Sequence, residues 1–238
     1  MTTGSRRVVM TQSNYIPWRG FFDMIDRADV VVLYDDAQYT RRDWRNRNKI
    51  KTATGPKWLT IPVKVKGRYE QRIYDTEVAD RWTTSHWSSI EQAYREAPCF
   101  AGERDFVADL YRQAAEFDHL SQVNRFFLES LCGRLTIDTP FLDSSSFELS
   151  GTSTEKLLNV CVELGATSYL SGPAAKDYLD VEAFSARGIE VEWMSFDYPD
   201  YPQLHGEFIG PVSVIDLLLH TGSAALDHIR PPIPSVTP

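Results

Sequence analysis

Cysteine is scarce in this chain, and long apolar runs are missing. The 238 residues hold three cysteines, Cys99, Cys132 and Cys161, which lie far apart and form no CxxC pair. This usage does not suit a disulfide framework and favours a reducing compartment. No apolar run reaches the roughly 18–20 residues of a membrane helix, and the first residues do not resemble a signal peptide. We therefore expect a cytoplasmic protein without a membrane span.

Several catalytic motifs are also missing from the chain. There is no GxSxG, no HExxH and no GxGxxG, which argues against an α/β-hydrolase, a zincin and a Rossmann dehydrogenase. The neighbouring carboxylates Asp35 and Asp36 could hold a metal ion, but no further acidic ligands follow them closely. We therefore assign no metal ligands, and the sequence does not identify a cofactor.

The net charge of −8 is distributed very unevenly along the chain. Residues 41–72 contain eleven Lys and Arg against two acids, a net charge of +9, so the other 206 residues carry −17. An acidic protein with one concentrated basic segment directs that segment at an anion. The large negative remainder makes nucleic acid an unlikely partner and favours a small anionic metabolite or a nucleotide-linked substrate.

The predicted elements alternate between strand and helix at both ends of the chain. The run VVVLY at 30–34 is typical of a strand buried on both faces, and residues 6–12 predict a strand before a helix over 18–28. Near the other end, strands are predicted over 167–170 and 188–193. This alternation predicts an α/β fold with a largely parallel sheet flanked by helices.

Between these ends we expect two additions to the sheet. Residues 41–72 predict a basic β-ribbon insertion, and residues from about 84 to 133 predict a helical middle section. We expect a single α/β domain over residues 1–230. The segment 231–238, which is rich in proline, is predicted to be an extended tail.

Three loops are expected beyond the carboxyl ends of the strands, where ligands bind in such sheets. In the loop after residue 34, Asp36 is our candidate general base. The Ser-Gly turn after residue 170 opens a helix whose first N–H groups favour an anion. From the three loops we expect substrate contacts by Gln12, Asn14, Tyr15, Asp35, Gln38, Ser171, Gly172 and Lys176.

The basic segment differs from a plain run of charge because tryptophan and asparagine are interleaved in it. In an extended chain the basic side chains from Arg45 to Lys51 alternate with uncharged ones and share one face. Guanidinium groups suit phosphate or carboxylate, and an indole can stack on a base or sugar. A solvated surface ribbon is the alternative. The substrate contacts expected here are Arg42, Trp44, Arg45, Asn46, Arg47 and Lys49.

A third candidate feature is a histidine in a glycine-containing loop. His205 precedes Gly206, and Glu207 follows two positions after the histidine, an arrangement that suits a general base with an orienting carboxylate. Together with Asp36, these two residues are our candidate catalytic groups. The alternative for each is an ordinary solvent-exposed loop residue.

Six segments of the chain carry a family resemblance: QSNYIPWRGFFD (12–23), DDAQY (35–39), the stretch 42–51, YLSG (169–172), and the segments 201–208 and 213–218. Together they resemble the WbqC-like family. The resemblance runs from about residue 8 to residue 222, and Ser13 stands where the family usually has proline, which bears on the stiffness of the loop. It implies a bacterial cytoplasmic protein from gene clusters for surface polysaccharide, O-antigen or related secondary metabolites, and it brings no settled catalytic residues.

A fainter resemblance concerns the first 36 residues. A strand, a Pro-Trp-Arg-Gly-Phe helix start and a second strand ending in aspartate are similar to nucleotidyltransferases whose helix begins with HxGH. Trp18 and Phe21 stand where those enzymes have histidine. The resemblance implies a related fold without the histidines of adenylyl transfer.

Three functional hypotheses follow from the sequence. The leading one is a biosynthetic transferase that modifies an amino sugar or a similar small polar metabolite, by N-acyl or aminoacyl transfer, with a carrier protein as one source of the donor. The second is a nucleotide-using ligase or nucleotidyltransferase. The third is a non-enzymatic nucleic-acid or tRNA binder that uses the basic segment.

Overall fold

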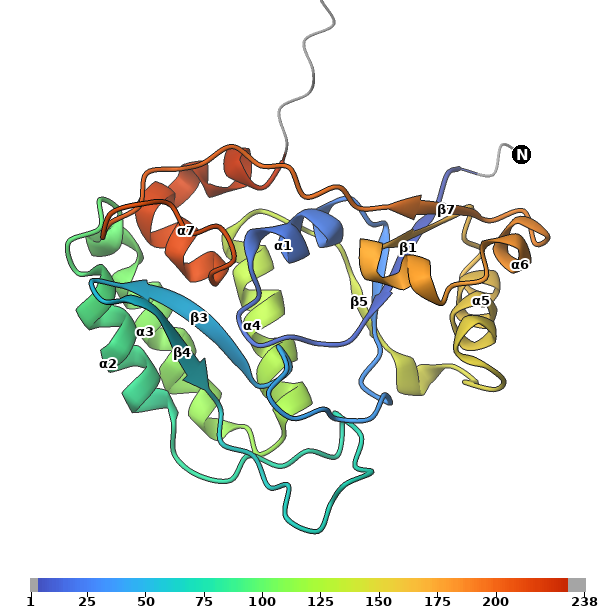
Figure 1. Cartoon of the computed structure of the whole chain (residues 1–238), viewed down its shortest axis with the longest axis horizontal. Coiled ribbons are helices and arrows are strands. Elements are labelled where there is room, and N and C mark those ends of the chain that lie inside the picture. Colours follow the sequence, from blue (N-terminus) through green and yellow to red (C-terminus); the bar gives the residue numbers. More distant parts are fainter. Residues whose placement is uncertain (1–3, 231–238) are drawn as a thin grey trace, which may run out of the picture.

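A five-stranded parallel sheet forms the centre of the molecule (Figure 1). The computed structural model describes residues 4–230. All neighbouring strands of the sheet are parallel. In spatial order the strands are β5 (Phe141–Asp143), β2 (Val30–Leu33), β1 (Arg7–Thr11), β6 (Ser168–Ser171) and β7 (Glu190–Trp193). The predicted α/β fold with a largely parallel sheet is confirmed.

The strands alternate between two apolar layers. Val9 and Val31 pack into the larger core, whereas Val8 and Val30, one residue earlier in each strand, pack into the smaller core on the other face. Every residue of β2 is buried. A β-branched run of this kind forms a strand because both of its faces are covered by apolar side chains.

Helices cover both faces of the sheet, with α1 and α4 on the opposite side from α5 and α6 (Figure 1). A capping box begins α5: the Thr152 side chain accepts from the Glu155 N–H, and the Glu155 side chain accepts from the Thr152 N–H. The helices are α1 (Arg19–Asp26), α2 (Thr83–Tyr94), α3 (Phe100–Gln113), α4 (Leu120–Arg134), α5 (Ser153–Glu163), α6 (Val181–Ser185) and α7 (Val214–Thr221). Short 3-10 turns are η1 (Ala114–Glu116), η2 (Ser144–Ser146), η3 (Pro173–Asp177) and η4 (Gly222–His228).

The basic segment forms a separate antiparallel hairpin of β3 (Arg47–Thr52) and β4 (Gly55–Thr60). Asn48 and Ile50 are buried, and the side chains of Arg47 and Lys49 lie on the other face, as the alternation predicts. Lys51 departs from the prediction. It is 1% exposed, because the loop carrying Glu207 covers it and accepts its Nζ hydrogen bond at 2.6 Å.

The helical middle section agrees with α2, α3 and α4, which lie beside the hairpin (Figure 1). Within residues 4–230, no helix is both long and apolar enough to cross a membrane. The predicted extended tail 231–238 lies outside the described residues.

Candidate functional site

Two adjoining cavities lie near the carboxyl edge of the sheet. In the sheet, β2 lies on one side of the β1–β6 pair and β7 lies on the other side. The connection that follows β1 and the connection that follows β6 therefore run in opposite directions, away from the boundary between β1 and β6. A cavity of about 620 Å³ lies at this point and is lined by residues from the ends of both strands. Such a divergence is where open α/β sheets bind their ligands. We call this cavity the sheet-edge crevice.

The crevice brings together residues from three of the four segments that predicted substrate contacts, and the predicted residues of the fourth, the loop after residue 34, do not line it. Thr11 and Leu170 mark the ends of β1 and β6 at its base, and Ser153 lies at the start of α5. The predicted residues that line it are Gln12, Asn14, Trp44, Arg45, Ser171 and Gly172.

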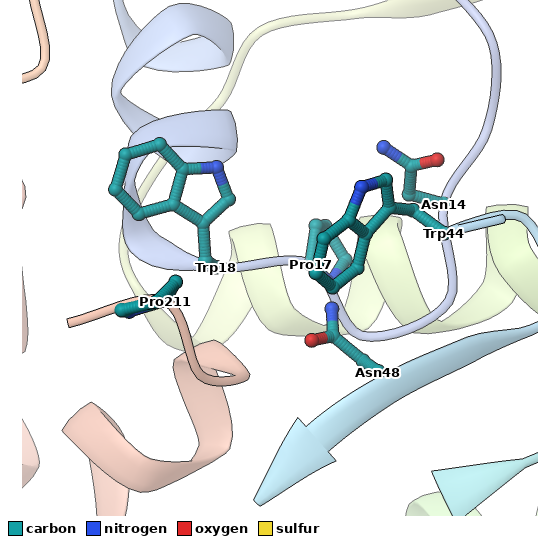
Figure 2. A pocket seen from close by; sticks show the side chains of 6 residues that line it. All are labelled: Asn14, Pro17, Trp18, Trp44, Asn48 and Pro211. Atoms are coloured by element: carbon teal, nitrogen blue, oxygen red, sulfur yellow. The ribbon is translucent and has the colours of Figure 1, made fainter. Parts of the chain in front are cut away.

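A second cavity of about 220 Å³ adjoins the crevice and shares Asn14, Trp18 and Trp44 with it. Figure 2 shows the two indoles on either side of this pocket, one at the start of α1 and the other ahead of β3. Pro17 and Pro211 also line it. We call this cavity the indole slot, because its walls are largely flat, apolar rings with the Asn14 amide among them.

The position of Trp18 depends on the glycine two residues later. A Cβ atom on Gly20 would collide with the six-membered ring of the Trp18 indole. The indole can therefore lie over the first turn of α1 only because that position has no side chain. Phe196, from the loop after β7, packs edge-on against the same indole at a centroid distance of 5.0 Å.

Arg45 is the cation of the crevice. Its guanidinium donates to the Asn14 side-chain oxygen, and a second nitrogen lies 3.6 Å from Asp43. Burial lowers the pKa of the guanidinium, and the carboxylates of Asp43 and Asp35 oppose this effect. The Nε of Arg45 is buried and has no hydrogen-bond partner among residues 4–230. Arg45 thus holds the Asn14 amide by a hydrogen bond and keeps one buried N–H without a partner.

Asp35 links the chain after β2 to the chain after β1 and does not line either cavity. Its Oδ1 accepts from the backbone N–H of Ser13 at 2.9 Å, and burial raises the pKa of the carboxyl. The Ser13 hydroxyl in turn accepts from Asn124 at 2.9 Å. Proline at position 13 could not donate to Asp35, so serine changes the hydrogen bonding of this loop as well as its stiffness.

Asp36 is not brought into either cavity. Its carboxylate pairs with Arg72 at 2.8 Å and accepts from the Ser144 hydroxyl at 2.6 Å. Both partners are distant in sequence, so nothing in the DDAQY segment indicated this pairing. The carboxylate proposed as a base from the sequence is occupied by two strong donors in the structure.

The predicted pair of His205 and Glu207 is also separate from the crevice. His205 lines a different cavity between the hairpin end and α2, and its Nε2 donates to the Ala93 carbonyl at 2.9 Å. Glu207 has an exposed side chain. The structure therefore does not bring Asp36, His205 and Glu207 together as one catalytic group.

The remaining predicted contacts lie outside the two cavities. Tyr15 is fully buried and bonded to Tyr111, and the buried Asn46 amide donates to the Ile61 carbonyl. The other predicted residues that line neither cavity are Gln38, Arg42, Arg47, Lys49 and Lys176.

Some residues that line the crevice had no assigned role from the sequence. Trp18 was noted only as the replacement of a histidine, although its place at a helix start after β1 was a usable signal. Tyr34 ends the run VVVLY, and the carboxyl-edge rule could have selected it. Tyr178 and Phe196 reach the crevice through the packing of loops and carried no local signal.

The chemistry of the lining is polar and aromatic. Among the residues that line the sheet-edge crevice there is no carboxylate, imidazole or thiol. Across residues 4–230, no group of three or more His, Cys, Asp or Glu side chains is placed to hold a metal ion. The crevice can therefore bind and orient a polar ligand through one guanidinium, amides, hydroxyls and indoles.

Comparison with known proteins agrees with this arrangement of segments. The model of the WbqC-like protein family matches residues 12–228. The chain belongs to the WbqC-like family. The match includes both loops of the crevice, the hairpin and α7.

One curated WbqC-like relative is similar over nearly its whole length. It is the uncharacterized protein Rv1507c of Mycobacterium tuberculosis (strain ATCC 25618 / H37Rv), 44% identical over 227 residues, which cover 94% of this chain and 98% of the relative. No solved structure matches the chain, and the suggested kinship with nucleotidyltransferases is not confirmed.

Proposed function

We propose that this WbqC-like protein is a biosynthetic transferase that modifies an amino sugar or a similar small polar metabolite. Family membership suggests a biosynthetic role. The observation that carries the finer proposal is the pair of joined cavities at the point where the strand connections diverge. Two joined compartments suit a reaction between two molecules that must meet.

The shape and lining of the indole slot support a ring-shaped acceptor. Its volume of about 220 Å³ and its walls of Trp18 and Trp44 suit a sugar-sized ring better than a flexible chain. The flat indole faces offer apolar surface on which the ring of a neutral amino sugar can pack. The Asn14 amide, held by Arg45, supplies a polar group beside the rings. An amino sugar combines these features.

The larger crevice would take the donor. Its volume of about 620 Å³ falls within the usual range for small-molecule sites. In N-acyl or aminoacyl transfer, the amine nitrogen bonds to the acyl carbon and the bond from that carbon to the carrier's sulfur or oxygen breaks. The amine proton then leaves with the carrier thiol or hydroxyl.

Such a transfer suits a crevice that has no general base in its lining. An activated ester and a neutral amine react readily once they are held together, so orientation supplies much of the rate. Arg45 lines the crevice, and its guanidinium would stabilise negative charge that develops on the acyl oxygen. Surface polysaccharide or secondary-metabolite biosynthesis would supply both substrates.

Binding of an amino sugar tests the acceptor side of this proposal. Saturation-transfer NMR and calorimetry with glucosamine and UDP-N-acetylglucosamine should detect binding that weakens roughly tenfold in Trp18→Ala. Trp87→Ala, a change on α2 away from both cavities, is the matched control. Equal binding by the two variants would contradict the assignment of the slot.

Turnover tests the donor side. Acyl thioesters offered with an amino sugar should release free thiol, measurable with a chromogenic reagent, and Arg45→Ala should reduce the rate at least tenfold. Arg187→Ala, which removes an exposed charge near α6, should leave the rate unchanged. Release of thiol at the same rate in Arg45→Ala would argue against Arg45 acting on the acyl oxygen.

A nucleotide-using ligase is the second candidate, and one observation favours it. Helix α1 has no side-chain cap at its start, and Gly20 in its first turn lines the crevice. Open backbone N–H groups at a helix start favour phosphate. Calorimetry with ATP and CTP tests this candidate, and absence of heat with both nucleotides would remove it.

A further inference from the structure

The outer face of the β3–β4 hairpin combines two indoles with two cations. Trp44 and Trp58 are 40% and 39% exposed, and their ring centroids lie 5.4 Å apart. The Arg47 guanidinium lies 4.0 Å from the Trp58 centroid, and Lys49 Nζ lies 4.9 Å from the same centroid. Lys49 is also the strand partner of Trp58. We call these four residues the hairpin face.

The two cations on this face have no acidic partner. Within residues 4–230, neither Arg47 nor Lys49 forms an ion pair, although both approach one ring. Two positive charges held at one ring repel each other, and a multivalent anion between them would relieve this repulsion. The cation–π contacts fix both groups in place before any ligand arrives.

The hairpin face continues into the candidate site through Trp44. This indole lines the slot and the crevice, and it also contacts Trp58 and lies 5.9 Å from Lys49 Nζ. A molecule that spans the boundary could place a reactive group in the crevice and an anionic end on the hairpin. A transferase donor attached to an anionic carrier has this form.

Three cations of the basic segment beyond the hairpin are paired with acids and do not extend this face toward a long polyanion. Lys64 and Arg68 pair with Glu77, and Arg72 pairs with Asp36 and Asp75. These pairs neutralise the cations that a nucleic-acid backbone would follow beyond the hairpin. Three other cations of the basic segment are thus neutralised, whereas the two on the hairpin face stay unpaired beside the candidate site.

We infer that the hairpin face binds the nucleotide part of the donor, with the phosphates between Arg47 and Lys49 and the base stacked on the exposed indoles. This inference rests on the proposed transferase function. A free nucleotide and the nucleotide end of coenzyme A present the same chemistry to this surface. Stacking and charge both contribute to binding at this face. A nucleoside lacks the phosphate and inorganic pyrophosphate lacks the base, so each makes only part of the contacts.

Indole NMR signals report this binding directly. The chain has six tryptophans, and Trp44→Phe and Trp58→Phe assign the two relevant Nε1–H signals in ¹⁵N-labelled protein. AMP and coenzyme A should shift both signals, whereas adenosine and pyrophosphate should bind at least about tenfold more weakly. Comparison of AMP with coenzyme A then identifies which source of the nucleotide is preferred.

A pair of variants separates the hairpin face from general charge effects. Arg47→Ala combined with Lys49→Ala should weaken AMP binding at least tenfold. Lys57→Ala removes a charge from the same hairpin, but Lys57 bonds to Ser89 of α2 and lies away from the indole pair, so it should change affinity less than twofold. A circular-dichroism spectrum checks that the double variant is folded.

Three outcomes would overturn the inference. They are unshifted Trp44 and Trp58 signals with both nucleotides, equal AMP affinity in the double variant and the wild type, or a short single-stranded RNA that binds over a hundredfold more tightly than AMP. Failure of the proposed transferase function would appear elsewhere, as amino-sugar binding that is unchanged in Trp18→Ala. Trp18 is not part of the hairpin face, so the two failures are distinguishable.

Discussion

The hydroxyl of Tyr15 lies 2.9 Å from Nδ1 of His86 in the interior of the protein. The other ring nitrogen of His86 lies 3.2 Å from the Thr60 carbonyl and must donate to it. Because burial lowers the pKa of His86, the ring is neutral, so Nδ1 accepts the Tyr15 proton. Tyr111 then donates to Tyr15 at 2.7 Å. This chain of hydrogen bonds contains a neutral imidazole. It ties Tyr15, in the loop after β1, to His86 of α2 and Tyr111 of α3.

The neutral state of His86 predicts a pH dependence of stability. Burial lowers the pKa of His86 from 6.5 to about 4. Between these values the unfolded chain binds a proton that the folded chain does not, so the free energy of unfolding falls as the pH falls through this window. The loss attributable to this residue approaches about 3 kcal/mol near pH 4.

Urea denaturation at pH 7, 6 and 5 measures this effect. The wild type should lose stability more steeply with acidification than His86→Gln, in which the titrating group is removed. Parallel pH profiles for the two proteins would show that His86 does not bind a proton on unfolding.

Gly20→Ala should disturb the indole slot. The new methyl group would collide with the Trp18 indole, which must move away from its position in the pocket. We expect amino-sugar binding to weaken at least tenfold, measured by calorimetry. Gly133→Ala is the control, because a Cβ there meets nothing within 4 Å and helix propensity predicts a gain of up to about 1 kcal/mol. Normal ligand binding by Gly20→Ala would contradict the role of the slot.

Asp216→Ala should be among the most destabilising substitutions in the chain. The carboxylate is fully buried, and its loss would leave buried donors without an acceptor, at a cost of about 3–5 kcal/mol in urea denaturation. Asp105→Ala, at a side chain that is 94% exposed, should change stability by less than about 0.5 kcal/mol. The donors to Asp216 are Tyr94 at 2.8 Å and Tyr201 and Gln203 at 2.7 Å.

Arg19→Lys should loosen the long segment 195–212. The buried Arg19 guanidinium donates to the Pro199 carbonyl at 2.8 Å and lies 4.9 Å from the Tyr198 ring centroid. Lysine keeps the charge but loses the planar group that makes these contacts. Chymotrypsin should cleave after Phe196 and Phe208 faster in this variant than in Arg187→Lys. Equal cleavage rates would show that Arg19 does not hold the segment.

His205→Ala should leave the pH–rate profile of acyl transfer unchanged. The imidazole lines a separate cavity and is bonded to a backbone carbonyl, away from the crevice. A rate measured from pH 6 to 9 with an acyl thioester and an amino sugar checks this prediction. A shifted or flattened profile would restore His205 as a general base and would require movement of its loop.

The sequence indicated the location of the crevice better than it indicated the catalytic groups. The carboxyl-edge rule selected loops that include Gln12, Asn14, Ser171 and Gly172, and all four line the crevice. The same rule selected Asp36, but Arg72 and Ser144 arrive from distant parts of the chain and occupy its carboxylate. Local sequence showed where the loops lie and did not show which partners reach them.

The sequence by itself determined the α/β class, the buried central strands and the face of the hairpin on which Asn48 and Ile50 are buried. These properties follow from residue periodicity and β-branching, which act over a few neighbouring positions. Only the tertiary structure decided that Trp18 and Trp44 face one pocket and that His205 lies elsewhere. Strand order and the course of the long segment 195–212 set those contacts, and both depend on packing between residues far apart in the chain.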